Sequence, residues 1–492
     1  MVRLLTHAAY FAIVFLMTSL VPKGSLGEIH ATTNTILVLG FLGTWRYTWA
    51  AINFTRAIIY VRYTYPRRKA RAFARFEARG APCHAYFLVT TYMVERDTTI
   101  DCYRALFLAA AQARDGATII ASVVEGSDER LIRSIFDTCH HDLSRVKLVL
   151  DRIKSNGKRD AMARTLKLIA AESPTARDIV VFVDGDTMVP ADIVAQSAPM
   201  FTNARVGALT TDEGIVLHKK NLFRDWFILR FNQRQVMMSS MGISNRVLTL
   251  TGRMSVFRAD LATNPDFVNG VLYDYLEHWR LGHVKFLTGD DKSTWYWLLK
   301  NGYEMTYLPD VQSVSMETQP AKTFFESSKV LMTRWFGNMM RTNARAIALG
   351  PRRLGFFTWW SILDQRISMW TTMVGPISVV LAAAFHSITI IPFYIAWVML
   401  TRYTFCVIIS LFRGTWFPIT HPFILYFGQI AGAAVKIYIL FRLDKQKWTR
   451  QGATTSGPKL SLSQRMAAFE STVHHVLALA WLMIAVVLVS KI

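Results

Sequence analysis

Long apolar stretches lie near both ends of the chain, and a region of mixed polarity separates them. Residues 7–22 contain no charged side chain and residues 33–53 contain only one. Since about 20 apolar residues in a helix cross a bilayer, these stretches predict a hairpin of two membrane helices within residues 1–61. Lys and Arg cluster between Arg62 and Arg79, and such clusters mark the cytoplasmic side of a membrane. We therefore expect the region that follows the hairpin to lie in the cytosol.

Short apolar runs alternate with helical patterns between residues 62 and 320. The runs cover residues 85–92, 118–124, 146–150 and 178–186. Continuous apolar runs of this length are typical of parallel strands in a sheet that is covered on both faces. The expected fold class is therefore α/β for this region, inserted into a set of membrane helices. Ligands of such folds bind beyond the carboxyl ends of the strands.

Aromatic and basic residues mix with apolar ones after residue 320. Residues 321–368 predict helices that lie in the membrane interface, because Arg, Trp and Phe recur along them. Residues 369–388 and 391–412 are apolar enough to form a second hairpin of membrane helices. The last predicted span is 472–492.

The stretch 418–441 is apolar but contains Pro418, Pro422 and Lys436. If it crossed the membrane, the basic segment that follows would lie outside, against the positive-inside rule. We therefore predict a re-entrant or interfacial helix here, which completes a membrane unit of residues 369–441. Residues 442–471 then form a cytosolic loop.

The composition narrows the class of protein. Of the 492 residues, 52% are hydrophobic and 18% are charged, so part of the chain is expected in lipid. The formal net charge is +22, and its position beside apolar segments favours contact with anionic membrane lipid. No nucleic-acid-binding signature accompanies this charge, so we expect no nucleic-acid partner. The four cysteines form no C-x-x-C pair, which argues against a disulfide framework or a cysteine-rich metal site.

The strongest chemical signal is Asp184-Gly185-Asp186, which directly follows a buried strand. Two carboxylates with this spacing can share a divalent cation, Mg²⁺ or Mn²⁺, and the cation in turn binds the oxygens of a diphosphate. The alternative is a solvated turn, because Asp-Gly is common in turns.

A second acidic pair, Asp290 and Asp291, follows Gly289. A carboxylate near the cation can take the proton from an attacking hydroxyl, and we assign this role to Asp291 with support from Asp290. The alternative is the N-terminal cap of a helix, and both roles are compatible.

Three further polar segments are candidates for binding a nucleotide. Carboxylates after the second strand can accept hydrogen bonds from a base, and cations after the third strand can bind a diphosphate. Arg334 can also bind diphosphate, and Trp335 can stack on an acceptor sugar. Charged surface loops and interfacial anchors are the alternatives. The candidates for the nucleotide are Glu125, Asp128, Lys154, Lys158, Arg159 and Arg334.

In this order the motifs resemble those of the processive family 2 glycosyltransferases, which include cellulose, chitin and hyaluronan synthases. The resemblance implies a GT-A glycosyltransferase domain, an inverting transfer from a nucleotide sugar, and a helical channel for the growing polysaccharide. The family motif Q-x-x-R-W has Leu331 at its first position here, whereas its Arg and Trp are kept.

The resemblance adds residues to the candidate site. Thr91-Tyr92-Met93-Val94-Glu95 is similar to the opening motif of the family, which implies donor contacts from Tyr92 and Glu95. The segment that contains Gly252 and Arg253 resembles the lining of the acceptor site. A segment over the active site, called the gating loop, matches Lys447, Trp448, Thr449 and Arg450.

Within this family, D-G-D, T-G-D-D, L-M-T-R-W and K-W-T-R-Q occur together in the branch that polymerises alginate in bacteria. This implies GDP-mannuronate as donor, β-1,4-polymannuronate as product, the inner membrane as location, and a cyclic-diguanylate-binding partner subunit. The residues alone leave open a synthase of another polysaccharide that uses a UDP-sugar. They also leave open a non-processive, lipid-linked sugar transferase and a transporter or lipid-binding protein.

Overall fold

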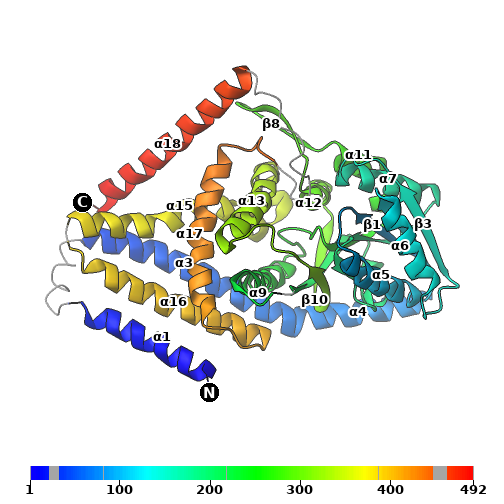
Figure 1. Cartoon of the computed structure of the whole chain (residues 1–492), viewed down its shortest axis with the longest axis horizontal. Coiled ribbons are helices and arrows are strands. Elements are labelled where there is room, and N and C mark those ends of the chain that lie inside the picture. Colours follow the sequence, from blue (N-terminus) through cyan, green and yellow to red (C-terminus); the bar gives the residue numbers. More distant parts are fainter. Residues whose placement is uncertain are drawn as a thin grey trace.

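The computed structural model describes residues 2–21, 33–80, 82–217, 219–385, 387–446 and 462–490. A region with a large sheet lies at one end, and long helices extend from it to the other end (Figure 1). We call residues 82–317 the sheet region and the long helices outside it the helical bundle.

The sheet region is built on eight strands in the order β3-β2-β1-β4-β7-β6-β10-β5. β3, β2, β1 and β4 are parallel, while β7 is antiparallel to both of its neighbours. The four apolar runs that predicted strands form β1 to β4, and the later strands make the sheet mixed. The strands are β1 (Ala85–Thr91), β2 (Ala117–Val123), β3 (Val146–Arg152), β4 (Ile179–Asp184), β5 (Thr187–Met188), β6 (Val206–Val216), β7 (Met254–Arg258) and β10 (Glu304–Met316); β8 (Tyr275–His278) and β9 (Gly282–Lys285) form a separate hairpin.

Helices connect the parallel strands, as a parallel pair requires. Strands β1, β2 and β4 are almost completely buried, and the core extends onto the connecting helices at residues such as Phe107 and Leu166. This rigid core fixes the strand ends at one edge of the sheet. The helices are α5 (Arg96–Ala111), α6 (Gly126–Asp137), α7 (Lys158–Ala171), α8 (Ile193–Ser197), η2 (Ala198–Thr202), α9 (Leu222–Gly242), α10 (Ala259–Ala262), α11 (Pro265–Leu272) and α12 (Asp290–Lys300).

Four helices within the described residues are long and apolar enough to cross a membrane. They are Phe356–Phe385, Ile390–Arg413, Thr420–Leu440 and Arg465–Leu488. The helices of the bundle are α1 (Val2–Ser19), α3 (Thr33–Ile59), α13 (Phe324–Ala348), α14 (Gly350–Leu354), α15 (Phe356–Phe385), α16 (Ile390–Arg413), α17 (Thr420–Leu440) and α18 (Leu462–Ser490). α1 and α3 lie alongside α15 and α16, although they are not among the four, so the N-terminal pair of spans stays a prediction (Figure 1).

The break expected between interfacial and membrane helices lies elsewhere. Residues 356–385 form one helix, α15, so the expected boundary at residue 368 falls inside it. The chain breaks instead at Gly355, whose φ of 79° is open to glycine but costly for other residues. α17 crosses the near-parallel α3, α15 and α16 at a steep angle in Figure 1, but its length and composition place it among the four candidate spans, so the re-entrant or interfacial helix stays a prediction.

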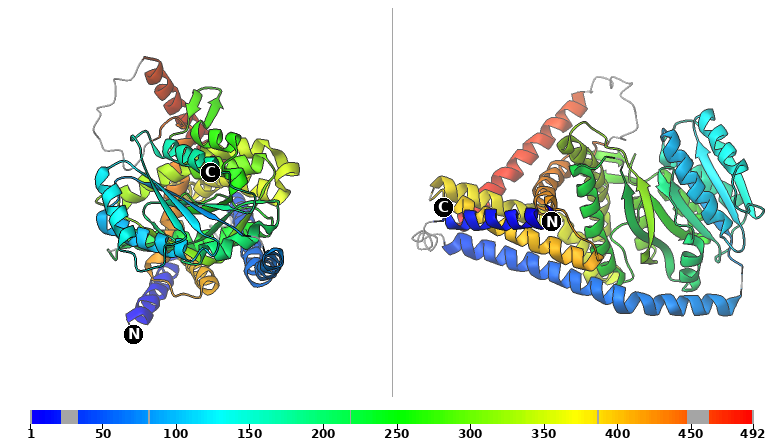
Figure 2. Two further views of the ribbon diagram at one scale, coloured as in Figure 1. Left: turned by 90° about the vertical axis from the view of Figure 1, so that its right-hand side faces the viewer. Right: turned by 60° about the horizontal axis from the view of Figure 1, so that its bottom comes forward.

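A continuous rod joins the bundle to the sheet region. α3 leads without a break through a π-helical turn, η1 (Tyr60–Thr64), into α4 (Tyr65–Arg79), and Figure 2 shows the rod running along the base of the sheet region. The Tyr60 hydroxyl donates to the Tyr307 carbonyl at 2.6 Å, and Lys69 forms an ion pair with Asp310 at 2.6 Å. The boundary expected after residue 61 therefore lies within this rod.

Candidate active site

The first acidic motif lies where β4 ends. Asp184 is the last residue of the strand, and the Gly185 amide donates to the Thr90 carbonyl at 2.9 Å. A Cβ on Gly185 would approach the Thr91 hydroxyl to 2.6 Å, so only glycine lets this turn lie so close to β1. The Asp184 amide donates to the carbonyl of Arg253 at 2.9 Å. These contacts fix the motif between the ends of two strands.

The second acidic motif begins α12. Gly289 has a φ of 81°, and Asp290 and Asp291 occupy the first turn of the helix. A Cβ on Gly289 would come within 2.7 Å of the Asn338 side chain on α13. The expected helix start is therefore present, and it is held close against a helix of the bundle.

Lys158 joins the two motifs. Its Nζ lies 2.7 Å from Asp184 Oδ1 and 2.9 Å from Asp290 Oδ2. A small cavity is lined by Lys158, Asp184, Gly252, Asp290 and Asp291, together with apolar side chains of β1, β4 and β7. Residues separated by more than a hundred positions in the sequence thus meet at one point.

The surroundings of Asp290 and Asp291 shift the pKa values of these two carboxylates in opposite directions. Burial acts to raise the pKa of Asp290, but Lys158 and Arg159 outweigh it and lower the pKa below its usual value. Burial and the charge of Asp290 raise the pKa of Asp291. One carboxylate is therefore a stable anion and the other has a greater affinity for a proton, a pairing typical of acid–base sites.

Burial, Asp186 and Asp290 raise the pKa of Asp184, while Lys158 opposes the shift. The site thus concentrates negative charge that one ammonium group balances in part. Among the described residues, no group of three or more His, Cys, Asp or Glu is arranged to hold a metal ion.

Arg159, the neighbour of Lys158, is buried and contacts the protein. Its guanidinium donates to the carbonyls of Val271 and Thr288 at 2.7 and 3.0 Å and to the Ser293 hydroxyl at 2.9 Å. These contacts hold the turn before the second acidic motif. The geometry therefore favours a positioning role over the donor contact that the sequence predicted.

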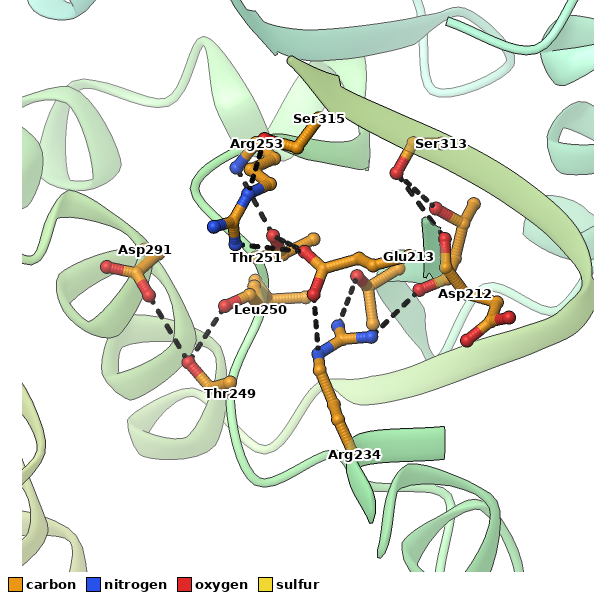
Figure 3. A network of polar contacts seen from close by, with 12 residues as sticks. Asp212, Glu213, Arg234, Thr249, Leu250, Thr251, Arg253, Asp291, Ser313 and Ser315 are labelled. Atoms are coloured by element: carbon orange, nitrogen blue, oxygen red, sulfur yellow. Dashed lines mark hydrogen bonds and ion pairs between the residues drawn. The ribbon is translucent and has the colours of Figure 1, made fainter. Parts of the chain in front are cut away.

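Arg253 lies in a network of charges that extends to the sheet (Figure 3). Its Nη2 is 2.6 Å from Glu317 Oε1, and its Nη1 is 3.6 Å from Glu213 Oε1. Glu213 also accepts a bond from Thr251 and pairs with Arg234 at 3.2 Å. Arg234 and Arg253 lower the pKa of Glu213 against the effect of its burial. The segment expected to line the acceptor site is thereby fixed to β6.

The interfacial motif faces the acidic site on one side and a cluster of rings on the other. Burial lowers the pKa of Arg334, and the nearby carboxylates of Glu317, Asp184 and Asp186 oppose this shift. Trp335 stacks on Trp226 with 5.6 Å between ring centroids and 13° between planes. One face of the expected sugar-stacking ring is thus covered by protein.

The remaining candidates lie outside the cavity. Tyr92 and Glu95 follow β1, Glu125 and Asp128 follow β2, and Lys154 follows β3, so all are near the same edge of the sheet. Glu95, Glu125 and Lys154 are exposed, and burial together with Glu125 raises the pKa of Asp128. The gating-loop residues Lys447, Trp448, Thr449 and Arg450 lie outside the described residues.

Sequence reasoning missed Glu213, Glu317 and Arg341. Arg341 is buried and donates to the Thr288 hydroxyl at 3.3 Å and to the Leu443 carbonyl at 3.2 Å. The signal for Glu213 is its place beside Asp212 in a strand that has no other charged residue, because buried acids need partners. No such signal exists for Glu317 and Arg341.

A mixed sheet with two acidic motifs at its edge, next to a set of apolar helices, is the arrangement of a membrane glycosyltransferase with a GT-A-like fold. The chain belongs to the Glycosyltransferase like family 2, whose family model matches residues 82–338. It is an enzyme that uses a nucleotide-sugar donor.

Two curated relatives point to a particular branch of this family. Glycosyltransferase alg8 of Pseudomonas syringae pv. tomato is 40% identical over 440 residues, which cover 89% of this chain and 87% of the relative. Glycosyltransferase alg8 of Azotobacter vinelandii is 39% identical over 439 residues, with the same coverage. These matches confirm the branch that the motifs predicted.

A solved structure shows a weaker likeness. The mannosyltransferase PcManGT from Pyrobaculum calidifontis, in complex with GDP-Man and Mn²⁺, is 18% identical, with a TM-score of 0.46. The match covers 78% of this chain and 98% of that chain. A likeness at this level does not transfer its ligands to this protein.

Proposed function

We propose that the protein is a processive, inverting polymerase of the alginate pathway. It transfers mannuronate from GDP-mannuronate to the end of a β-1,4-polymannuronate chain and passes the chain across the inner membrane. The observation that carries this proposal is the meeting of both acidic motifs at Lys158. The two alg8 relatives, similar along 89% of the chain, support the choice of polymer.

The chemistry is one displacement at the anomeric carbon. The acceptor hydroxyl oxygen forms the new bond, the bond from that carbon to the diphosphate breaks, and GDP leaves. Asp291 takes the hydroxyl proton, because its environment raises its affinity for protons. Asp290 stays ionised beside Lys158 and orients the turn that carries the base.

Asp184 and Asp186 fit a divalent cation. A cation of the Mg²⁺ type is commonly held by one or two protein carboxylates, with water and substrate phosphates as its other ligands. When bound, the cation would neutralise charge on the departing diphosphate. Lys158 holds Asp184 in place at 2.7 Å.

The other candidates surround this centre in the proposal. Arg334 reaches the diphosphate, which its closeness to Asp184 and Asp186 supports. Gly252, Arg253 and Trp335 form the acceptor side. The proposed donor contacts on the strand-end loops are Tyr92, Glu95, Glu125, Asp128 and Lys154, and the proposed gating loop contains Lys447, Trp448, Thr449 and Arg450.

We further propose that the sheet region lies in the cytosol, where the donor is made. The basic helix α4, which η1 joins to α3, supports this orientation. A cyclic-diguanylate-binding subunit is the proposed partner, on the strength of the likeness to the alginate-polymerising branch.

The test supplies purified membranes with GDP-mannuronate or with UDP-sugars, and measures release of nucleoside diphosphate and uronate polymer. We expect polymer only with GDP-mannuronate and a divalent cation, and no turnover after chelation until Mg²⁺ or Mn²⁺ is restored. If polymer formed only with a UDP-sugar, the donor would be that UDP-sugar and not GDP-mannuronate. Turnover that survives chelation would remove the metal from the proposal.

A further inference from the structure

Two partly buried cations form no ion pair within the described residues. Arg230 lies on α9 and Lys436 on α17, and neither forms a hydrogen bond or ion pair with any described residue. Their contacts are with rings. The Arg230 guanidinium carbon lies 5.1 Å from the centroid of Trp335 and 5.7 Å from that of Phe336, and Lys436 Nζ lies 4.8 Å from that of Phe336.

Such an arrangement is costly unless a ligand completes it. Burial lowers the pKa of Arg230 to about 10, which reflects the loss of solvent around its charge. Both side chains are nevertheless partly exposed. Among the described residues, some side-chain nitrogen and oxygen atoms are fully buried without a hydrogen-bond partner, but none of these belongs to Arg230 or Lys436. The charged ends of both side chains are therefore within reach of solvent.

A continuous series of contacts joins these cations to the candidate active site. The Arg253 guanidinium carbon is 5.9 Å from the centroid of Phe227, and that ring is 5.6 Å from Trp335. Trp335 in turn contacts Arg230. We call Trp226, Phe227, Arg230, Trp335, Phe336 and Lys436 the aromatic path. It begins at Phe227, which lies beside Arg253, and ends at Lys436 on α17.

Polar side chains continue along the same helix face into the bundle. Gln429 is seven residues before Lys436 and therefore on its side of α17. Gln429 accepts a bond from Arg402 at 2.7 Å, and the hydroxyls of Tyr394 and Tyr426 are 3.1 Å apart. Arg402 is a charged side chain within a candidate span, and such residues typically face the interior of a helix bundle or a water-filled cavity.

We propose that Arg230 and Lys436 bind the carboxylates of newly added uronate units as the polymer leaves the active site. The inference rests on the proposed function and assigns the polymer's charge to two named residues. A uronate offers both matching features: an apolar sugar face that packs on a ring, and a carboxylate that pairs with a cation. A neutral polysaccharide would leave both charges unpaired.

The test measures binding of a radiolabelled β-1,4-mannuronate hexamer to the full-length protein in nanodiscs of a zwitterionic lipid. The neutral β-1,4-mannohexaose is the matched ligand. Arg230→Met and Lys436→Met should each weaken binding of the uronate hexamer by about tenfold, since a charge-assisted bond is lost. Binding of the neutral hexamer should change by less than about twofold, because its ring contacts remain.

Three variants serve as controls. Arg230→Lys and Lys436→Arg keep the charge and should keep most of the preference for the uronate hexamer. Lys329→Met removes an exposed cation from α13, the helix that carries Trp335, and should change neither affinity.

Equal loss of both hexamers, shared by the charge-conserving variants, would overturn the inference because it would show a structural role. An unchanged preference for the uronate in both Met variants would also overturn it. Either result for the variants is compatible with a wild-type protein that polymerises mannuronate, in which case the proposed function stands. Failure of the wild type to release GDP from GDP-mannuronate would refute the proposed function itself.

Discussion

Cations have different contact partners in the acidic site and in the aromatic path. Lys158 contacts two carboxylates, and Arg253 contacts Glu213 and Glu317. Arg230 and Lys436 contact rings, and no described carboxylate pairs with them. The acidic site is thus a connected network before any ligand binds. The aromatic path instead has charge left for a ligand to balance.

The difference follows from what each region does in the proposed mechanism. A displacement reaction needs its groups fixed in advance, and shared ion pairs fix them. A moving polymer needs contacts that it can exchange from one sugar to the next, and rings with unpaired cations suit repeated, weaker binding. Changes in the first region should therefore have larger effects than changes in the second.

The largest effect is expected for Asp291→Asn. The amide keeps the size of the side chain but cannot take a proton, so turnover should fall by at least about 100-fold. GDP release from purified membranes measures this loss, with protein level checked in parallel. Asp266→Asn, an exposed change in the first turn of α11, is the matched control and should be silent. Retained polymer synthesis in Asp291→Asn would end the assignment of the base.

A severe effect of another kind, on stability, is expected for Glu213→Ala. The change leaves Arg234 and Arg253 enclosed without their shared partner, which should cost about 3–5 kcal/mol of stability. Thermal unfolding followed by tryptophan fluorescence measures the lower midpoint. Glu277→Ala removes an exposed pair with His283, and its midpoint should stay at the wild-type value. An equal midpoint for both variants would mean that the Glu213 network adds no stability.

Two glycines with positive φ separate strain from crowding. Gly282→Ala should cost about 1–2 kcal/mol, since its φ is 65° and nothing lies near the added Cβ. Gly289→Ala should destabilise more and should also lower turnover, because its Cβ meets Asn338 at 2.7 Å and displaces Asp290 and Asp291. Both are measured by unfolding and by GDP release. Equal effects of the two changes would show that α13 does not constrain the second motif.

The smallest effect is expected for Trp335→Phe in the aromatic path. A smaller ring remains beside Trp226 and Arg230, so acceptor binding should weaken by about 0.5–1.5 kcal/mol. Kinetics with a mannuronate oligomer as acceptor should show a higher KM and an unchanged kcat. Trp416→Phe, at a position that is 81% exposed, is the control. A large fall in kcat would place Trp335 with the chemistry instead of the path.

The sequence predicted the sheet and the acidic motifs well because their signals are local. The apolar runs form β1 to β4, and Asp184 ends its strand as expected. The fate of adjacent side chains could not be predicted. Lys158 and Arg159 are neighbours on α7, yet one contacts both acidic motifs and the other contacts carbonyls of distant segments. Their directions depend on how α7 packs, which no local pattern encodes.

Long-range partners explain the other differences. Arg230 and Lys436 are 206 positions apart and contact the same ring, so neither residue alone indicated a shared site. Trp335 was expected to offer a ring to sugar, but the stacking partner on one face, Trp226, comes from another helix. A pattern of hydrophobic and polar positions predicts which face of each helix is buried, but it does not predict which helices pack against each other.

The rod formed by α3, η1 and α4 is a rigid connection between the helical bundle and the sheet region. Each residue in a helix turns the chain by about 100°, so a single residue inserted at the π-helical turn would rotate α4 relative to α3. Lys69 would then face away from Asp310, and the ion pair that joins α4 to β10 would be lost. The length of this rod thus sets the angle between the sheet region and the helical bundle.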